Sequence, residues 1–397
     1  MLHLRIWLVL ILCIVPVAPS EAVPAPARVK RIAFLVDSWY RWSHADVIGT
    51  RFLEGYRVGE RVHASPLTVA SVYTDRPRAE DQTRTIAARY GFRVATSIAD
   101  ALLEDPQSPR PRLAVDGVLV ATREDLPDSG QPQSPMRRLQ VVREVLRIMD
   151  QTGSHVPIFI DKMLASSWTD SHAIVTEAAR RHVPLMAGSV LPFPPLDQPI
   201  RTSGVEVGVV AASTPYWAFA FHAAELLQGL MEQRNPREGG VSQVREVGSG
   251  YGSLPDRDRW GGRVFDALLG STRTRRGRGS LGTAAHAILI QYVDGARAVL
   301  ALVPDAFDDS EFLLGAQYAD GTTSTSGLVL RGQPYDHFGY LVHALVEFFT
   351  TGRAPVPVER TLLTTGIVVF GQQSRLSGGS VSTPPLAISY PAPRTRQ

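Results

Sequence analysis

Lys162 is one of only two lysines in this chain of 397 residues, since all other members of its 41 basic residues are arginines. It follows Asp161 at the end of the apolar segment 156–160 (VPIFI). A lysine can lose its proton when it is partly desolvated, whereas an arginine cannot, so a lysine at the carboxyl end of a strand suits proton transfer. The alternative is a lysine that pairs with a neighbouring acid for structural reasons.

The segment that follows the first apolar run, RIAFLV (31–36), contains no glycine and has the sequence DSWYRWSH (37–44). Glycines directly after a strand let the backbone approach the pyrophosphate of a dinucleotide at the N-terminus of the next helix. Here we expect Asp37 to repel a pyrophosphate and the two tryptophans to fill its place. Arg41 and the free amides before Ala45 could still bind an anion.

Other polar residues follow the later strands. The carboxyl ends of parallel strands meet at one edge of a doubly wound sheet, where ligands bind. Asp75 ends the second strand, where an acid accepts hydrogen bonds from an adenosine ribose, or serves equally well as a turn residue. His44 and Asp46, at the start of the first helix, are expected to face the same crevice as Lys162. The candidate cofactor-binding residues are Ser38, Arg41, His44, Asp75, Thr122 and Asp161.

Several other kinds of site are not indicated. The histidines lack the spacing of metal ligands, so no metal site is predicted. Cys13 is the only cysteine, which excludes disulfides and, once a leader is removed, a cysteine nucleophile. Gly188 and Ser189 lack the surrounding pattern of a nucleophile elbow, and no histidine is expected to pair with Ser189. The net charge of +3 does not indicate a nucleic-acid partner.

Strand and helix patterns alternate along the first half of the chain. This alternation implies right-handed crossovers, so a Rossmann-like α/β domain with a doubly wound parallel sheet is predicted for residues 31–191. The expected strands are 31–36, 67–73, 115–121, 156–160 and 184–187, and the expected helices are 45–56, 80–90, 98–103, 136–151 and 169–181.

From about residue 192 the apolar runs become longer and richer in β-branched residues. A C-terminal α+β domain with a largely antiparallel open sheet is predicted for residues 192–390. Its expected strands are 205–212, 285–292 and 298–303, its expected helices are 218–233 and 337–350, and the Arg/Gly segment 273–282 is expected to be a loop.

Residues 1–22 have the layout of a secretory signal peptide, with an apolar run over 6–15 and small residues after it. The apolar run is shorter than the roughly 20 residues that a membrane-spanning helix needs. Cleavage near Ser20 or Ala22 is therefore expected, followed by a linker over 23–30. The protein is predicted to be exported, with no membrane attachment after cleavage.

Three segments, VDGVLVA (115–121), VPIFIDKMLA (156–165) and PLMAGS (184–189), resemble in order and composition the glucose–fructose oxidoreductase, inositol dehydrogenase and rhizopine catabolism (Gfo/Idh/MocA) family. The resemblance spans residues 30–390. It implies an N-terminal Rossmann domain that binds NAD or NADP, and a C-terminal domain whose open sheet binds substrate and often builds oligomers.

The family has Glu-Lys-Pro where this chain has Asp161-Lys162-Met163. The resemblance implies that Lys162 assists proton transfer while hydride passes between a sugar carbon and nicotinamide. The family also has an Asp and a His four residues apart on the first long helix of the second domain. His222 looks like that histidine, whereas Ala218 stands in the place of the acid. Ala218, Met163 and the missing glycines depart from the family pattern.

Two functions follow. The first is an exported NAD(P)-dependent oxidoreductase that acts on a sugar, a polyol or a related hydroxyl compound, with Lys162 as the acid/base and His222 beside it. The second is a catalytically silent carbohydrate-binding or scaffold protein that keeps the fold without the pyrophosphate loop. A glycosidase that works by transient oxidation is a further candidate by analogy. The expected partners are a carbohydrate-like small molecule and a second copy of the chain, bound through the C-terminal sheet.

Overall fold

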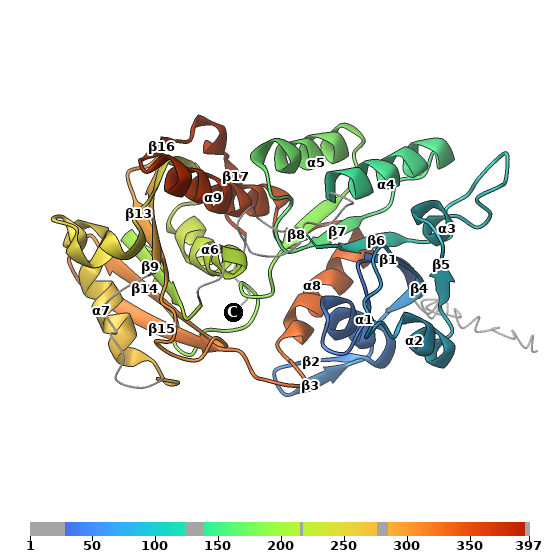
Figure 1. Ribbon diagram of the computed structural model, residues 1–397, viewed down its shortest axis with the longest axis horizontal. Helices are drawn as coiled ribbons and strands as arrows, with labels where there is room; N and C mark the ends of the chain where they lie inside the picture. Colours follow the sequence, from blue (N-terminus) through green and yellow to red (C-terminus); the bar gives the residue numbers. More distant parts are fainter. Residues whose placement is uncertain (1–27, 124–137, 215–216, 276–284, 394–397) are drawn as a thin grey trace, which may run out of the picture.

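The computed structural model describes residues 28–123, 138–214, 217–275 and 285–393. The predicted signal peptide and residues 276–282 of the predicted Arg/Gly loop lie outside the described residues. In the described part the chain forms two sheets, each with its own helices, joined side by side (Figure 1).

The first sheet has six parallel strands in the order β5-β4-β1-β6-β7-β8, which confirms the predicted doubly wound sheet. Its strands are β1 (Lys30–Val36), β4 (Leu67–Thr74), β5 (Arg93–Ala95), β6 (Gly117–Ala121), β7 (Ile158–Asp161) and β8 (Leu185–Gly188), and its helices are α1 (His44–Glu54), α2 (Thr83–Tyr90), α3 (Ile98–Leu102), α4 (Arg138–Thr152) and α5 (Trp168–Arg180).

Successive residues of a strand point to opposite faces of the sheet, and β1 is apolar on both. Phe34 packs in the same cluster as α1, whereas Leu35 packs in the cluster that α3, α4 and α5 cover. Three of these helices begin alike: the hydroxyls of Ser43, Ser97 and Ser167 accept hydrogen bonds from the amides of Asp46, Asp100 and Asp170. These N-caps set the points at which the chain leaves each loop.

The second sheet has seven strands in the order β15-β14-β9-β13-β12-β11-β16, and only β9 and β13 pair in parallel. This confirms the mostly antiparallel second domain. Its strands are β9 (Val205–Ala212), β11 (Val241–Glu246), β12 (His286–Tyr292), β13 (Arg297–Leu302), β14 (Glu311–Tyr318), β15 (Thr323–Val329) and β16 (Val381–Ser382), and β10 (Arg237–Glu238) pairs separately with β17 (Tyr390–Pro391).

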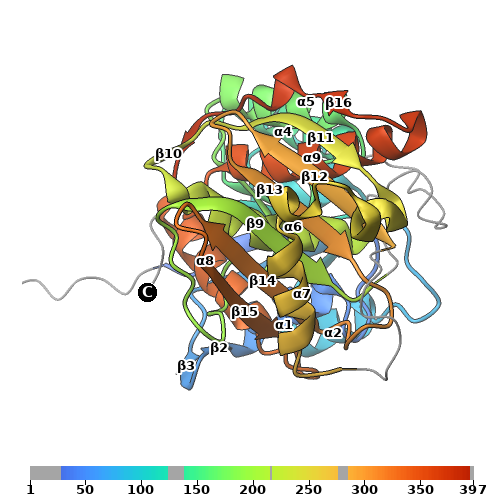
Figure 2. The same ribbon diagram turned by 90° about the vertical axis from the view of Figure 1, so that its left-hand side faces the viewer.

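Helices cover both faces of this sheet. α6 (Trp217–Met231) and α9 (Val358–Ser377) lie between the two sheets, whereas α7 (Gly262–Ser271) covers the outer face (Figure 1). Figure 2 looks onto that outer face and shows α7 lying across the strands. Phe265 and Leu268 of α7 are buried against Val209 and Val299. Part of the outer face is thus covered by the chain itself, and self-association through this sheet stays a prediction.

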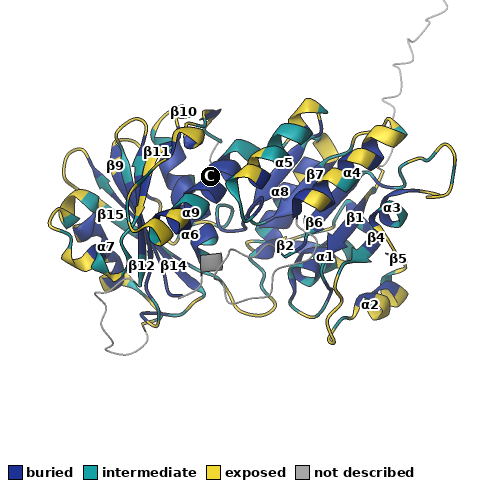
Figure 3. Ribbon diagram, turned by 45° about the horizontal axis from the view of Figure 1, so that its top comes forward, coloured by how far each residue is buried: buried dark blue, intermediate teal, exposed yellow. Residues whose placement is uncertain are grey.

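One helix of the second half belongs by packing to the first sheet. The predicted helix over 337–350 is α8 (Phe338–Thr351), and it lies beside α1 and the hairpin of β2 (Tyr56–Val58) and β3 (Arg61–His63). A Cβ atom on Gly117 of β6 would come within 2.5 Å of the Phe349 ring, so glycine allows this close approach. Figure 3 shows that the strands of both sheets are largely buried and that the exposed residues lie on the outer sides of helices such as α2, α4 and α7.

Candidate functional site

Lys162 lies at the carboxyl end of β7 with an unusual backbone conformation. Its φ is 73°, in the left-handed region, and its amide donates a hydrogen bond of 3.0 Å to the carbonyl of Gly188 at the end of β8. A non-glycine residue in this region costs on the order of 1–3 kcal/mol, and such strain is concentrated at functional sites. The backbone therefore places the Lys162 side chain at the edge of the sheet where ligands of this architecture bind.

Asp161 is the centre of a charged cluster behind Lys162. Its Oδ2 atom lies 3.3 Å from Nζ of Lys162 and 2.7 Å from Nδ1 of His44, although the His44 nitrogen does not point straight at the oxygen. The side chain of Asp161 is 4% exposed, whereas those of Lys162 and His44 are 36% and 31% exposed. A buried carboxylate thus holds two groups that solvent and a ligand can reach.

The charges around Asp161 keep it ionised. Burial opposes ionisation, but His44, Lys162 and Arg138 together hold the pKa of Asp161 well below its ordinary value. Arg138, at the start of α4, is 2% exposed and donates hydrogen bonds to the carbonyls of Met163 and Thr122. For His44, burial and Lys162 lower the pKa, although Asp161 acts in the opposite direction.

His222 of α6 reaches the same place from the second domain. Its Nδ1 atom lies 2.6 Å from Oγ of Ser189, the residue that follows β8. The prediction that no histidine pairs with Ser189 is therefore wrong, because α6 docks its side chains onto the end of the first sheet. Glu225, one turn further along α6, accepts the Ser189 amide at 3.3 Å. Lys162 and His44 are near enough to act electrostatically on His222.

Two histidines near this site are held neutral. Burial lowers the pKa of His222 to about 3, and Lys162 and His44 act in the same direction. Burial lowers the pKa of His337, at the start of α8, to about 4, and Arg51 adds to the effect. Protonating either ring in the folded protein is therefore unfavourable.

Acid is expected to destabilise the protein through these two histidines. Below pH 6.5 the unfolded chain takes up their protons, whereas the folded protein resists protonation until about pH 4 for His337 and pH 3 for His222. The free energy of unfolding should fall by several kcal/mol between pH 6.5 and 3, because each unit of pKa shift is worth about 1.4 kcal/mol. Buried Glu232, with a pKa of about 7, acts in the opposite direction between pH 7 and 4.5.

Urea unfolding at several pH values measures this loss. A His337→Gln variant should show a shallower loss than wild type, whereas a His155→Gln variant, which changes an exposed histidine, should follow wild type. An equal pH dependence in all three proteins would contradict the prediction.

The turn between β1 and α1 is closed by its own side chains. The carboxylate of Asp46 accepts hydrogen bonds from the Trp42 amide at 2.9 Å and from Nε1 of Trp39 at 3.1 Å. The prediction that Asp46 faces the crevice is therefore wrong, because these two donors turn it back into the turn. Ser38 donates to Asp81 at 2.7 Å and is 5% exposed.

The two tryptophans of this turn have different positions. Trp39 is fully buried and stacks between Phe34 and Phe92, with ring centroids 5.7 Å and 5.5 Å away. It lies in the core, not at the helix N-terminus where the sequence placed it. Trp42 is half-buried against Tyr335, with Arg41 stacked over its indole at 4.8 Å.

The remaining predicted ligands lie at the ends of β1, β4 and β6. Asp37 accepts the Arg123 amide at 2.6 Å, and burial raises its pKa, with Asp75 contributing. Asp37 Oδ1, Asp75 Oδ2 and Thr122 Oγ1 are buried and have no hydrogen-bond partner among the described residues. The three oxygens are enclosed in this structure, and the two carboxylates at this edge are unfavourable neighbours for a phosphate.

Other sites in the described residues do not compete with this one. No group of three or more histidine, cysteine or acidic side chains there could hold a metal ion. No helix that the structure describes is long and apolar enough to cross a membrane.

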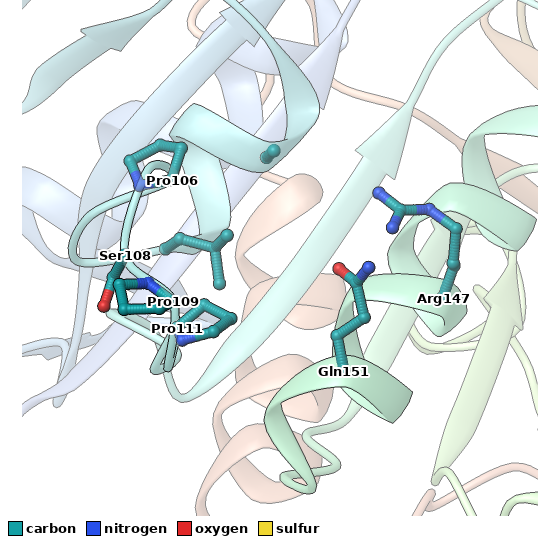
Figure 4. A pocket seen from close by; sticks show the side chains of 8 residues that line it. Pro106, Ser108, Pro109, Pro111, Arg147 and Gln151 are labelled. Atoms are coloured by element: carbon teal, nitrogen blue, oxygen red, sulfur yellow. The ribbon is translucent and has the colours of Figure 1, made fainter.

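A cavity of about 510 Å³ lies between α3, the proline-rich segment after it and α4 (Figure 4). The proline-rich segment leads into the amino end of β6, whereas the candidate residues lie at the carboxyl ends of the strands. None of the candidate residues therefore lines this cavity.

Comparisons with known proteins identify the architecture. No protein-family model matches the chain, and no curated protein matches its sequence. Among solved structures, GenD2 from gentamicin A biosynthesis, in complex with NAD, is 14% identical with a TM-score of 0.57, covering 91% of this chain and 99% of GenD2. An apo scyllo-inositol dehydrogenase from Lactobacillus casei is 11% identical with a TM-score of 0.55, covering 90% of this chain and 99% of that protein.

A putative myo-inositol dehydrogenase from Sinorhizobium meliloti is 13% identical with a TM-score of 0.53, covering 89% of this chain and 99% of that protein. These similarities extend over both sheets, so they support the resemblance seen in the sequence as a likeness of fold. The chain therefore has the two-domain fold of the Gfo/Idh/MocA-type dehydrogenases, a Rossmann-like parallel sheet followed by a mixed, mostly antiparallel one.

Proposed function

We propose that this protein is an oxidoreductase that acts on a hydroxyl-bearing carbon of a small polyhydroxylated compound, such as a sugar or a polyol. The observation that carries the proposal is the placement of Lys162, whose partly exposed Nζ lies 3.3 Å from buried Asp161 at the carboxyl end of the first sheet. The two inositol dehydrogenases of the same fold support this class of reaction.

In this proposal Lys162 moves the hydroxyl proton. Oxidation of an alcohol removes the proton from oxygen and a hydride from carbon, and a positioned amine accelerates the proton step. Asp161 holds Nζ in place, and its charge is maintained by Arg138 as well as by Lys162 itself. His222 lies beside Lys162 and can make a hydrogen bond to the substrate oxygen.

NAD or NADP is the redox partner that this fold implies, but the residues of the β1–α1 turn do not fit it. A pyrophosphate needs free amides and positive potential at the start of the helix. Here the Asp46 carboxylate, which accepts the Trp42 amide and Nε1 of the buried Trp39, places a negative charge in the first turn of α1, and Asp37 stands at the end of β1. We therefore assign the proton step to Lys162 and assign no residue to hydride transfer.

Three measurements test the proposal. Denaturing the purified protein shows whether it carries a nucleotide, and calorimetric titration shows whether NAD or NADP binds. A screen of polyols, beginning with myo-inositol and with NAD, NADP and artificial electron acceptors supplied, then tests for oxidised product. Turnover by wild type that is lost in Lys162→Arg is the expected result. A folded protein that binds polyols but oxidises none of them with any acceptor would overturn the proposal.

The closed β1–α1 turn favours a second candidate, a carbohydrate-binding protein without redox chemistry. In that case a sugar or polyol still raises Tm, but no acceptor supports its oxidation, and Lys162→Arg binds it as wild type does. The measurements above therefore separate the two candidates.

We also propose that the protein is exported, since residues 1–22 have the layout of a signal peptide. N-terminal sequencing of the protein secreted by its own cells tests this proposal. A mature N-terminus within residues 19–24 is expected, and an N-terminus at Met1 would contradict it.

A further inference from the structure

A buried polar network connects α9 to the residues that line the site. Arg360, Thr361 and Thr364 of α9 are at most 2% exposed, and so is Glu225 of α6. The three α9 residues belong to the segment 355–365, which no step of the proposed function uses. Burying this many polar groups is costly unless each finds a partner, so their arrangement is specific.

Glu225 is the acceptor at the centre of the network. One carboxylate oxygen accepts the Thr364 hydroxyl, and the other accepts the Ser189 amide at 3.3 Å. Arg360 donates to the Glu225 carbonyl at 2.8 Å, and its charge stabilises Glu232, with which it forms an ion pair at 3.3 Å, and to a smaller extent Glu225. Thr361 donates to the Ala187 carbonyl in β8 at 2.8 Å. The network thus fixes the end of β8 and the position of Ser189.

The hydrogen bonds of Ser189 determine the tautomer of His222. The hydroxyl oxygen of Ser189 accepts the Leu191 amide at 3.2 Å, and its only other polar contact among the residues that the structure describes is Nδ1 of His222 at 2.6 Å. If Nδ1 carried the proton, the hydroxyl hydrogen of Ser189 would have no acceptor among the described residues. With the hydroxyl donating to Nδ1, both groups are satisfied and the proton of the neutral ring lies on Nε2.

We propose that Ser189, held in place by Glu225 and Thr364, fixes His222 as the Nε2–H tautomer, so that His222 serves as a hydrogen-bond donor to an oxygen of the crevice ligand. Nε2 makes no hydrogen bond to any described residue, and the His222 side chain is partly exposed. Glu225 and Thr364 are positioning residues, because they act through Ser189. The donor role toward a ligand rests on the proposed function, whereas the tautomer does not.

Nitrogen NMR of the protein labelled with ¹⁵N-histidine tests the inference without any substrate. His222→Gln identifies the His222 signals, whose shifts distinguish the two tautomers. Wild type should show Nε2–H. Ser189→Ala should reduce the tautomer ratio about fivefold or more, the factor that one net hydrogen bond supplies.

Thr364→Val should reduce the ratio in the same direction, and Thr364→Ser should restore it. Thr383→Val is the matched control, since it removes an equally buried hydroxyl that donates to the Val241 carbonyl of β11 at 2.9 Å and makes no contact with Glu225 or Ser189 among the described hydrogen bonds. It should leave the tautomer unchanged.

An Nδ1–H tautomer in wild type, or an unchanged ratio in Ser189→Ala, would overturn the inference. Equal effects of Thr364→Val and Thr383→Val would overturn the part played by α9. If Thr364→Val does not fold, Ser189→Ala and Thr364→Ser still decide the matter. The tautomer does not depend on redox activity, so a protein without that activity would show the same tautomer. The polyol screen tests the proposed function separately.

Discussion

A Lys162→Arg variant is expected to lose about 10²- to 10⁴-fold in polyol turnover while it keeps its affinity for the polyol. Arginine retains the positive charge next to Asp161 but cannot give up its proton near neutral pH. Because both side chains are non-glycine, the strain of the left-handed backbone at φ 73° is the same in both proteins. The loss should therefore appear in kcat, with little change in KM or Tm.

Lys30→Arg is the matched control, since it changes the only other lysine, at the start of β1 and at the opposite end of the strand from the site. It should turn over the polyol at the wild-type rate. A Lys162→Arg variant within about threefold of wild type would show that Lys162 supplies charge rather than proton transfer.

A Trp39→Ala variant is expected to lower the free energy of unfolding by about 3–5 kcal/mol. The indole is fully buried between Phe34 and Phe92, and a cavity there would be enclosed by α1 and β1. The packing is tight, because a Cβ atom added to Gly49 of α1 would lie 2.2 Å from the indole. The substitution also removes the Nε1 donor of Asp46. Urea unfolding at pH 7 measures the loss.

Two variants give this measurement its controls. Trp42→Ala removes the neighbouring indole, which is half-buried and packs on Tyr335, so it should cost clearly less. Trp39→Phe keeps a ring in the stack but loses the hydrogen bond to Asp46 and part of the ring volume, so it should fall between wild type and Trp39→Ala. Equal losses for Trp39→Ala and Trp42→Ala would contradict the placement of Trp39 in the core.

The Trp39 result also bears on the cofactor. In this turn the chain uses a core tryptophan and the Asp46 carboxylate where a dinucleotide site uses glycines and free amides. A large loss in the free energy of unfolding of Trp39→Ala would show that this turn itself stabilises the fold.

The sequence by itself determined the alternation of strands and helices, and with it the edge at which Lys162, Asp161 and His44 meet. This succeeded because apolar runs of period two and 3.6 are local signals, and because the carboxyl ends of parallel strands share one edge. Local signals did not reveal α9, since its buried side mixes polar residues with apolar ones. They also did not reveal the direction of Asp46, whose partners Trp39 and Trp42 depend on how the turn folds.

Only the tertiary structure decided how the second domain completes the site. His222 and Ser189 meet because α6 docks on the end of the first sheet, and the Leu164 amide bonds the Thr365 hydroxyl although the two residues are 201 positions apart. α8 likewise returns to cover the first sheet. Such contacts arise from the packing of whole elements against one another, and the spacing of residues within one element carries no record of them.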